Sequence, residues 1–421
     1  MNEPNRRVFL GTMGALAVTG TTRARAAGGD RVRMAVIGVR GRGSDLVSSF
    51  LKTDGAEIVA VCDVDDSAFA KSVKRVQSAT GKAPRTEKDF RRLLDDKNID
   101  AVAIATPDHW HALMTVMACQ AGKDVYCEKP ASHNIVEGRR MVQAARKYDR
   151  VVQLGTQRRS SPAIQEAVEL VREGRIGKVS LARTWLYQVR PTIGHGEPGE
   201  VPKGVDYAMW QGPAPDRPFY PNRFHYNWHW FWNWGTAENG NNGVHGVDIA
   251  RWGLGVDDPL RVTSGGGKLY FDDDRETPDT EVVTWEFPEC AITWEYIMSS
   301  KHPIDGTNFG IEFLGDKGTL LISSSGWKIT DGDKNEERKG DEMQVAHARN
   351  FLDCVHSRSK PNADIEIGHL TTRLCHLGNI AHRTGKKLTF DAKSETFPDQ
   401  PEANALLSRE YSSRFSMPSE V

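Results

Sequence analysis

The chain has 421 residues, with 55 basic and 56 acidic side chains and a formal net charge of −1. A chain of this length predicts two domains, each with its own hydrophobic core. The near-zero charge disfavours nucleic acid or an anionic membrane as the main partner, because proteins that bind phosphate backbones carry a clear basic excess. The hydrophobic fraction of 38% is typical of a soluble globular protein.

The first residues of the chain predict a targeting segment. Arg6 and Arg7 precede an uncharged run, and Ala24-Arg25-Ala26 has the small-x-small form of a processing site. The run is too short to span about 30 Å of hydrocarbon. The paired arginines followed by x-Phe-Leu resemble a twin-arginine export signal, a route for folded proteins. We therefore expect residues 1–26 to be a signal peptide and the protein to be periplasmic or secreted, with a basic tail as the alternative.

The six cysteines are expected to be free thiols. Cys62 and Cys127 end apolar, strand-like runs and Cys119 lies in a helical pattern, where cysteine commonly serves as a small buried apolar residue. No Cys-x-x-Cys pair or Cys/His cluster has metal-ligand spacing, and His225 and His229 lack a suitably spaced third ligand. We therefore predict no metal site.

From residue 33 the sequence alternates between short apolar runs and helical patterns, as βαβ units do. Gly122 is expected to end one helix, and Asn134 with Glu137 to cap the next. The fold class is therefore α/β, with a doubly wound parallel (Rossmann) sheet over residues 30–155. Its predicted strands are 34–37, 57–62, 101–105, 124–127 and 151–154, and its predicted helices run to about residue 52 and over 66–78, 87–95 and 109–121, with one more after residue 134.

The turn after the first strand, Gly38-Val-Arg-Gly-Arg-Gly43, is typical of dinucleotide binding. Glycines there allow a tight turn and let the backbone approach a pyrophosphate at the positive end of the next helix. Arg40 occupies the middle glycine position, so we expect Gly41 to free the backbone and Arg40 or Arg42 to supply positive charge.

An acidic residue follows at the spacing that a ribose requires. Asp63 ends the second strand twenty residues after Gly43, where a carboxylate accepts both hydroxyls of the adenosine ribose. Asp65 adds a second negative charge that would repel a 2′-phosphate, so NAD is favoured over NADP. The alternative is an ordinary glycine turn in a domain that binds no nucleotide.

Two further motifs, Thr106-Pro-Asp-His-Trp-His111 and Glu128-Lys129-Pro130, follow the predicted strands that end near residues 105 and 127. Ligands of parallel sheets gather at these carboxyl ends. Together with the glycine turn, these motifs resemble those of the Gfo/Idh/MocA oxidoreductases. Residues 239–252 and Gly315-Asp-Lys-Gly-Thr-Leu320 resemble motifs of the family's second domain, so the likeness covers nearly the whole chain after the signal.

The resemblance implies roles for individual residues. Lys129 matches the lysine that binds the substrate hydroxyl beside the nicotinamide and lowers the pKa of that hydroxyl, and the bond before Pro130 is commonly cis in the family. His245 matches the family's acid/base histidine. A surface lysine and a structural core histidine are the alternatives. The implied cofactor-binding residues are Gly38, Arg40, Gly41, Arg42, Gly43, Asp63, Thr106, Pro107, His111, Glu128, Lys129 and Gln157.

The chain departs from the polyol dehydrogenases of that family at Asn241, where they have an aspartate four residues before the histidine. An amide can bind a hydroxyl but cannot carry its proton. Glu238 or Asp248 is a candidate for the missing carboxylate, and Asp248 could equally be a buried structural partner.

Residues 156–421 predict a second, α+β domain. Strand-like runs at 179–185, 281–287, 291–298 and 311–314 indicate a large, mostly antiparallel sheet, with helical patterns at 347–358 and 370–383. The resemblance implies that this domain binds the substrate and that its open sheet face forms a homodimer or homotetramer.

Four of the eleven tryptophans fall between Trp228 and Trp234. Aromatic faces stack on the C–H patches of sugar rings, and indole and imidazole groups bond hydroxyls. We therefore predict a carbohydrate site, with Trp228, His229, Asn241 and His245 as substrate-binding residues. A hydrophobic plug or an oligomer contact is the alternative, and we expect both uses.

These features predict an NAD-dependent oxidoreductase that oxidises a secondary hydroxyl of a sugar, glycoside or polyol, by hydride transfer to a tightly bound nicotinamide. A retained cofactor also suits a redox-neutral glycosidase, which would oxidise the ring, eliminate the aglycone, add water and reduce the ring again. A noncatalytic sugar-binding protein with the same fold is the third hypothesis.

Overall fold

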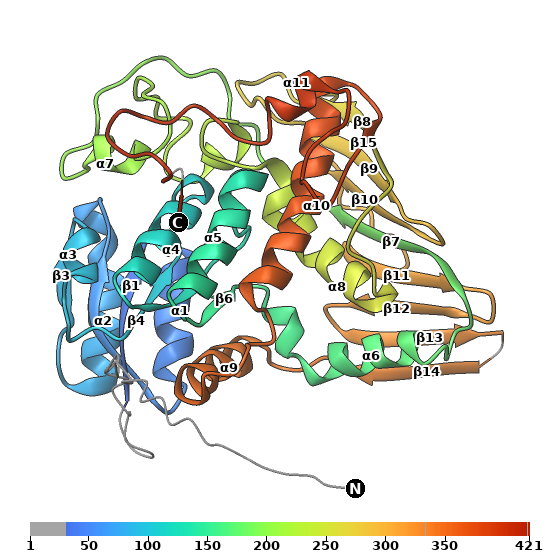
Figure 1. The fold of residues 1–421 in the computed structure, drawn as a ribbon, viewed down its shortest axis with the longest axis horizontal. Coiled ribbons are helices and arrows are strands. Elements are labelled where there is room, and N and C mark those ends of the chain that lie inside the picture. The colour runs from blue at the N-terminus through green and yellow to red at the C-terminus, as the bar shows by residue number, and fades with distance from the viewer. Residues whose placement is uncertain (1–30, 333, 419) are drawn as a thin grey trace, which may run out of the picture. The chain divides into compact units, whose positions relative to one another are not determined.

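Two β-sheets, each covered by helices, organise the chain (Figure 1). A computed structural model describes residues 31–332, 334–418 and 420–421, and residues 31–421 pack as a single unit. The predicted signal peptide lies outside the described residues.

The N-terminal sheet has six parallel strands in the order β3-β2-β1-β4-β5-β6, which confirms the predicted Rossmann sheet. The strand order reverses direction between β1 and β4, and the carboxyl ends of strands form a ligand crevice at such a point. Its elements are β1 (Val32–Ile37), α1 (Arg42–Leu51), β2 (Ala56–Cys62), η1 (Asp66–Ala68), α2 (Phe69–Thr80), β3 (Arg85–Glu87), α3 (Arg91–Leu94), β4 (Ala101–Ile104), α4 (Asp108–Gln120), β5 (Asp124–Cys127), α5 (Ile135–Lys147) and β6 (Val152–Leu154).

Local sequence signals account for most of these boundaries. Gly122 has φ +75°, and the Asn134 side chain caps α5 by accepting from the Glu137 backbone N–H, both as predicted. The predicted helix over 87–95 is wrong at its start, because residues 85–87 pair with β2 as an edge strand. This strand lacks an apolar run, so its pattern did not reveal it. All six cysteines are free thiols.

The second sheet has nine strands in the order β14-β13-β12-β11-β7-β10-β9-β8-β15. Only β7 and β10 pair in parallel, which confirms the predicted, mostly antiparallel sheet. The strands are β7 (Val179–Tyr187), β8 (Arg261–Gly267), β9 (Thr280–Glu286), β10 (Ala291–Ile297), β11 (Phe309–Gly315), β12 (Thr319–Ser323), β13 (Gly326–Asp331), β14 (Lys334–Lys339) and β15 (Leu388–Thr389).

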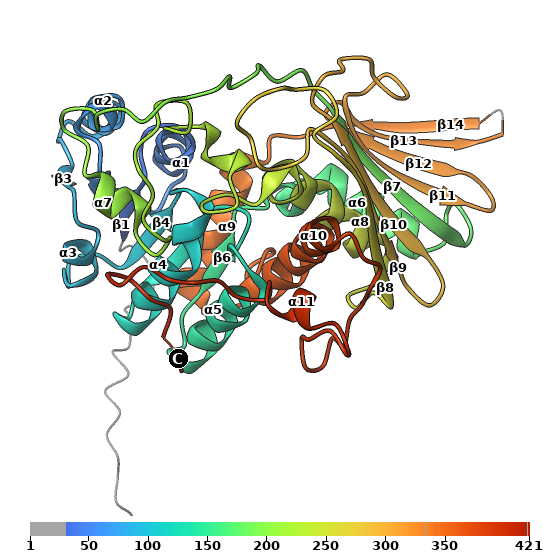
Figure 2. The same cartoon turned by 90° about the horizontal axis from the view of Figure 1, so that it is seen from above.

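Helices gather on one side of this sheet, and Figure 2 shows the strands bare on the other side. Burial alternates along β10, as expected for a sheet with one covered face, and Trp185, Trp285 and Trp294 are fully buried. The helical elements of this half are η2 (Gln157–Ser160), α6 (Pro162–Arg172), α7 (Tyr207–Gln211), η3 (Asn227–Trp230), the π-helix η4 (Asn239–Gly243), α8 (Val244–Leu254), α9 (Gln344–Ser357), α10 (Ile365–Thr384) and α11 (Pro401–Asn404).

The two halves share packing. Phe351 of α9 lies edge-on against Phe50 and Tyr126 of the N-terminal half, with ring centroids 6.1 and 5.9 Å apart. Helix α10 contacts both α5 and β8. The boundary predicted at residue 155 falls between β6 and η2, but residues far beyond it complete the core around the Rossmann sheet.

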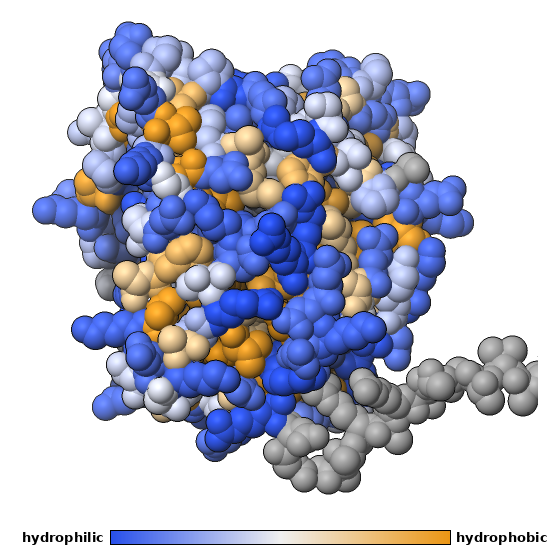
Figure 3. Space-filling view, turned by 90° about the vertical axis from the view of Figure 1, so that its left-hand side faces the viewer, coloured by the Kyte–Doolittle hydropathy of each residue, from blue (hydrophilic) through white to orange (hydrophobic). Residues whose placement is uncertain are grey.

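The outer surface is mixed in character. Figure 3 views the molecule from the side of α3 and β3, and apolar residues lie there in recesses framed by hydrophilic ones. In the part of the chain that the structure describes, no helix has the length and apolar character needed to cross a bilayer.

Candidate active site

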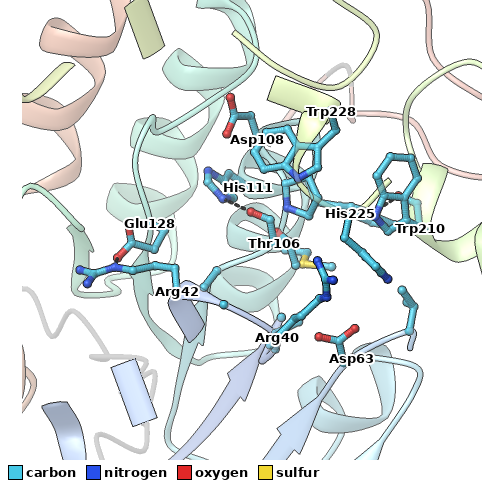
Figure 4. Close-up of a pocket in the computed structure, with 18 of the residues that line it drawn as sticks. Arg40, Arg42, Asp63, Thr106, Asp108, His111, Glu128, Trp210, His225 and Trp228 are labelled. Atoms are coloured by element: carbon cyan, nitrogen blue, oxygen red, sulfur yellow. Dashed lines mark hydrogen bonds and ion pairs between the residues drawn. The ribbon is translucent and has the colours of Figure 1, made fainter. Parts of the chain in front are cut away.

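A cavity of about 610 Å³ lies at the carboxyl ends of β1, β2, β4 and β5 (Figure 4). Its opposite wall comes from the second half of the chain, from α7, η3 and η4. The predicted site residues that line it are Gly38, Arg40, Gly41, Arg42, Asp63, Thr106, Pro107, His111, Glu128, Lys129, Trp228, His229 and Asn241, whereas Gly43, Gln157 and His245 do not line it.

The glycine turn forms a cradle at one end of the cavity. Gly38 has φ +82°, and a Cβ there would meet the carbonyl oxygen of Ala105 at 2.6 Å. A Cβ on Gly43 would lie 1.8 Å from the Gly38 carbonyl oxygen, so Gly43 packs the helix against the turn. Gly41 has open space around its Cβ position on the cavity wall. The turn thus leaves room for a ligand directly before α1.

The two arginines of this turn differ in their partners. Arg42 donates from Nε to Oε1 of the buried Glu128 at 2.7 Å and also bonds the Gln344 side chain. Arg40 is exposed and lies beside Asp63 at the cavity edge (Figure 4). We infer that Arg40 is the arginine available to a pyrophosphate.

Asp63 is held rigidly at the end of β2. Its Oδ2 accepts from the Val39 backbone N–H at 2.8 Å and its Oδ1 from the Asp65 backbone N–H at 3.1 Å. Burial raises the pKa of this carboxyl group, and the backbone donors oppose that rise. Asp65 does not line the cavity, because its carboxylate caps η1 and pairs with His225 at 2.8 Å. Of these two aspartates, Asp63 is therefore the one that lines the cavity.

Residues 203–229, which we call the covering segment, cross the edge of the Rossmann sheet at this point. The Asp206 backbone N–H bonds the Val64 carbonyl oxygen at 2.9 Å, and Lys88 Nζ bonds the Gly204 carbonyl oxygen at 2.8 Å. The indole N–H of Trp110 donates to the Trp210 carbonyl oxygen at 3.1 Å. The second half of the chain thus covers the nucleotide end of the cavity.

Lys129 projects into the middle of the site. Its Nζ donates to the backbone carbonyl of Asn241 at 2.9 Å and to Asn241 Oδ1 at 3.2 Å. The Lys129–Pro130 bond is cis, as the family resemblance implied. Asn241 lies in η4, and π-helical turns often occur at functional sites. An ammonium group is thereby oriented toward the junction of the two halves.

His111 and Glu128 line the cavity but bond mainly to protein groups. His111 Nδ1 lies 2.7 Å from the Pro130 carbonyl oxygen and Nε2 lies 2.8 Å from the Thr106 carbonyl oxygen. Each ring nitrogen therefore lies within hydrogen-bond distance of a backbone carbonyl oxygen. The ring ties the loop after β4 to the loop after β5, and neither nitrogen is left for the cofactor.

The structure separates the two candidates for the missing carboxylate. Asp248 forms two bonds with Arg159, at 2.7 and 2.8 Å, and accepts from Thr371, so it is a buried structural partner. Glu238 is fully buried, lies 3.3 Å from Arg190 and accepts from Asn241 Nδ2 at 3.4 Å. Glu238 is therefore the carboxylate beside Asn241.

His245 lies at the start of α8 and does not line the cavity. Its Nδ1 is buried and has no hydrogen-bond partner among the described residues. Burial, followed by the charge of Lys129, lowers its pKa well below the ordinary value. Gln157 Oε1 is likewise buried and unpartnered. The roles implied for these two residues stay predictions.

The aromatic clump divides between core and cavity. Trp230, Phe231 and Trp234 belong to the hydrophobic core of the second half, Trp228 both belongs to that core and lines the cavity, and His229 lines the cavity. The two expected uses, sugar binding and a plug or oligomer contact, stay predictions. The cavity-lining residues that sequence reasoning did not assign to the site include Lys88, Asp108, Trp110, Met114, Met209, Trp210, His225 and Tyr226.

Asp108 and Trp110 lie inside the Thr106–His111 motif and could have been found there, since ligands gather at strand ends. Trp210 carries no such signal, because it reaches the cavity only through the long-range path of the covering segment. Asp108 is 2% exposed, and its Oδ2 accepts from Thr236 Oγ1 at 2.6 Å. Burial raises the pKa of its carboxyl group.

These residues fit a dinucleotide. The turn is open at Gly41, the hydroxyl oxygen of Thr106 is buried without a partner among the described residues, and Asp63 and Arg40 offer one acidic and one basic group. A group of His, Cys, Asp and Glu side chains able to hold a metal ion is absent from the residues that the structure describes.

Comparison with protein families agrees with this geometry. Residues 32–156 match the model of the oxidoreductase family's NAD-binding Rossmann fold, and residues 183–417 match that of its C-terminal alpha/beta domain. The chain belongs to the Gfo/Idh/MocA oxidoreductase family. The first match confirms the predicted NAD-binding Rossmann fold.

Individual relatives are distant. A glycosyl hydrolase family 109 protein of Stenotrophomonas maltophilia is 29% identical over 49% of this chain and 49% of its own length. The myo-inositol 2-dehydrogenase of Thermotoga maritima is 28% identical over 70% of this chain and 75% of its own length. The chain spans about half the length of the first curated relatives that it matches.

Solved structures share the fold. The WlbA dehydrogenase from Bordetella pertussis, crystallised in complex with NADH and UDP-GlcNAcA, superposes with a TM-score of 0.65 at 20% identity. The match covers 86% of this chain and 99% of that one.

Proposed function

We propose that this protein oxidises a secondary hydroxyl of a sugar, glycoside or polyol with NAD as the acceptor. One observation carries the proposal: the Lys129 ammonium, fixed by Asn241, lies in the same cavity as the nucleotide cradle at Gly38 and the aromatic wall at Trp228. A cation there binds the hydroxyl oxygen and stabilises the negative charge that develops on it.

The chain's own residues divide the work along the cavity. Asp63 would bind the ribose hydroxyls of the nucleotide, Arg40 would bind its pyrophosphate, and Trp228 would stack against the substrate ring. His111 keeps the Lys129–Pro130 turn fixed against the loop after β4. When bound, NAD supplies the hydride acceptor. The similarity to a myo-inositol 2-dehydrogenase and to a dehydrogenase crystallised with NADH and UDP-GlcNAcA supports this substrate class.

A redox-neutral glycosidase is the second candidate. The covering segment bonds the Rossmann edge at Val64 and Lys88, which favours a nucleotide that stays bound between turnovers. A retained nucleotide suits a cycle in which the ring is oxidised and then reduced again on the same protein. The match to a glycosyl hydrolase family 109 protein supports this candidate.

One experiment distinguishes the candidates. Mass spectrometry of the denatured protein reveals any co-purified NAD, and the native protein is then incubated with myo-inositol, free aldoses and aryl glycosides. A net change in nicotinamide absorbance at about 340 nm supports the dehydrogenase. Cleavage of an aryl glycoside without net change supports the glycosidase. If the protein binds a sugar, catalyses neither reaction, and binds that sugar equally well as Lys129→Ala, it is a noncatalytic sugar-binding protein.

We also propose that the protein is exported with its cofactor bound and acts as a homodimer or homotetramer. The Arg6-Arg7 motif supports export, and the uncovered face of the nine-stranded sheet, where Val282 is 45% exposed, supports assembly. Replacing both arginines by lysine should leave the protein in the cytoplasm, as judged by cell fractionation. Sedimentation analysis gives the number of subunits.

A further inference from the structure

A guanidinium close to the active-site cavity has no carboxylate partner. Arg158 lies in η2, and its side chain makes no hydrogen bond or ion pair with another residue that the structure describes. Its Nη1 is buried. Burial lowers the pKa of Arg158 to about 10, so the group stays positively charged at neutral pH. Because desolvation of a charge is costly, a buried cation is ordinarily paired with an anion.

Other arginines nearby have such partners. Arg159, the next residue in the chain, forms two bonds with Asp248 at 2.7 and 2.8 Å. Arg42, at the cavity, pairs with Glu128 at 2.7 Å. Of these three arginines, Arg158 alone keeps a positive charge that no carboxylate of the described chain neutralises.

An aromatic ring holds the Arg158 side chain in place. The guanidinium carbon lies over the Phe309 ring, at the start of β11, 4.5 Å from the ring centroid. Phe309 in turn packs near Trp294 of β10, with centroids 6.3 Å apart, and the Trp294 indole nitrogen is buried without a partner among the described residues. A guanidinium held over a ring is pre-organised while its N–H donors stay available to a ligand.

Arg158 lies beside His245, about one helical turn beyond the cavity. His245 follows Asn241 by four residues on the continuous η4–α8 helix, and Asn241 lines the cavity. Element η2 contacts α8. Burial first, and then the positive charges of Lys129 and Arg158, lower the pKa of His245. His245 is thus close to both cations.

The surroundings of Arg158 are polar and partly open. Gln157, Arg158, His245 and Phe309 each keep part of their surface exposed. Gln157 Oε1 and His245 Nδ1 are nevertheless buried without hydrogen-bond partners among the described residues. Such atoms are rare in folded proteins, and they mark places where a ligand or water completes the bonding. A ligand that extends from the cavity past His245 would meet these atoms together with the guanidinium.

We propose that Arg158 binds a carboxylate group of the substrate, so that the protein acts on an acidic sugar such as a uronic or aldonic acid. This rests on the proposed oxidation and narrows its substrate class. The hydroxyl to be oxidised binds at Lys129, and the carboxylate of the same molecule binds the Arg158 guanidinium. The arginine fork bonds both oxygens of a carboxylate through charge-assisted hydrogen bonds. Arg158 therefore selects an anionic substrate over a neutral sugar of the same size.

Binding to the protein saturated with NADH tests this selection without turnover, because NADH cannot accept a hydride. Calorimetry compares D-glucuronate, D-galacturonate and D-gluconate with D-glucose and with D-glucose 6-phosphate, whose anion is not planar. The wild-type protein should bind at least one of the carboxylic acids more tightly than D-glucose. Arg158→Gln should bind that acid about 10-fold to 100-fold more weakly, the usual effect of losing a hydrogen bond to a charged group.

Two results of this comparison overturn the proposal. One is that no carboxylic acid binds more tightly than D-glucose, and the other is that the sugar phosphate binds more tightly than every carboxylic acid. Arg158→Lys keeps the charge but not the planar fork, so it should retain part of the affinity. Arg92→Gln is the matched control and should bind as wild type does, because the Arg92 side chain is 73% exposed on the Rossmann half.

Turnover separates this proposal from the proposed oxidation. With NAD and the acid that binds, Arg158→Gln should raise KM about 10-fold to 100-fold and change kcat by less than about twofold, because the carboxylate is not the reacting group. If an acid binds through Arg158 and no hydride is transferred, the oxidation fails and the acid site stands. If neutral sugars are oxidised and Arg158→Gln changes neither binding nor KM, the acid site fails and the oxidation stands.

Unfolding of the protein without a sugar gives an independent check. Arg158→Met removes an unpaired charge and keeps an apolar side chain against Phe309, so its urea midpoint should be equal to or above that of wild type. A clear fall in the midpoint would show that the guanidinium stabilises the fold, and this would overturn the proposed role.

Discussion

At the residue scale, the site depends on Lys129, whose ammonium bonds an amide side chain and contacts no carboxylate among the described residues. Lys129 Nζ bonds two oxygens of Asn241, and Asn241 in turn donates to Glu238. An aspartate in place of Asn241 would bring a full negative charge to the ammonium. With an amide there, more of the positive charge is available to a substrate oxygen.

Lys129→Met tests that charge, because methionine keeps most of the side-chain length and removes the ammonium. We expect kcat/KM to fall by about 100-fold or more, since stabilisation of developing negative charge is lost. The amount of bound NAD, measured on the denatured protein, should not change. Lys178→Met is the control, since Lys178 pairs with Glu289 on the surface. An unchanged kcat/KM in Lys129→Met would contradict the assigned role.

A second residue-scale prediction concerns Glu281, which is buried in the second half. Burial raises its pKa to about 7 from an ordinary 4.5, although Ser264, Tyr296 and Asn239 donate hydrogen bonds to it. The folded state therefore binds a proton that the unfolded state has released. The free energy of unfolding should fall as pH rises from about 4.5 to 7, by at most about 3 kcal/mol from this group.

Glu281→Gln cannot ionise and should remove this part of the pH dependence. Urea unfolding of both proteins at several pH values between about 4.5 and 7 measures it. Glu289→Gln, at an exposed surface carboxylate, should keep the wild-type slope. If wild type and Glu281→Gln show the same slope, Glu281 is not protonated in the folded protein.

At the element scale, the covering segment joins the second half to the nucleotide edge. It bonds the Rossmann half through Val64 and Lys88, and His225 pairs with Asp65. The Val64 contact joins two backbone groups, the Lys88 contact joins a side chain to a backbone carbonyl, and the His225 contact joins two side chains. The segment must loosen before a nucleotide beneath it leaves.

Lys88→Ala should accelerate NAD release, because Lys88 Nζ bonds the Gly204 carbonyl and pairs with Asp66 at 3.1 Å. Loss of about 1 kcal/mol at this contact corresponds to about a fivefold faster release. The measurement is the NAD that remains bound during timed dialysis. Lys71→Ala, at an exposed position of α2, provides the comparison. Equal release from both variants would mean that the segment does not retain the nucleotide.

At the scale of the whole molecule, helix α9 makes the two halves interdependent. Phe351 is fully buried against Tyr126 and against Phe50, which lies just over three hundred residues earlier in the sequence. The Rossmann sheet therefore lacks part of its cover unless the end of the chain has folded. Unfolding is expected to be a single cooperative event for residues 31–421.

Phe351→Ala should lower the free energy of unfolding by about 3 to 5 kcal/mol, the usual cost of removing a buried phenylalanine ring. The unfolding transitions followed by circular dichroism and by tryptophan fluorescence should move to the same lower urea concentration. This is informative because the described tryptophans lie mostly in the second half, whereas the lost contact is with the first. Two separate transitions would show that the halves unfold independently.

The N-terminal half was the more predictable part of the fold. Its buried parallel strands are continuous apolar runs, such as residues 57–62, and its glycines mark the turns. Edge strands such as β3 and β14 are polar, so their pairing does not appear in the pattern. The glycine turn, Asp63 and Lys129 could be found because each follows a strand end directly.

Sequence alone established the strand-end motifs, the Rossmann class and the family resemblance, because these depend on spacing within a few dozen residues. It left open which carboxylate accompanies Asn241 and which tryptophan reaches the cavity. Those answers needed the fold: Asp248 is paired with Arg159, Glu238 bonds Asn241, and Trp228 but not Trp234 lines the cavity. Pairing across long loops depends on packing of the whole chain, which local periodicity does not encode.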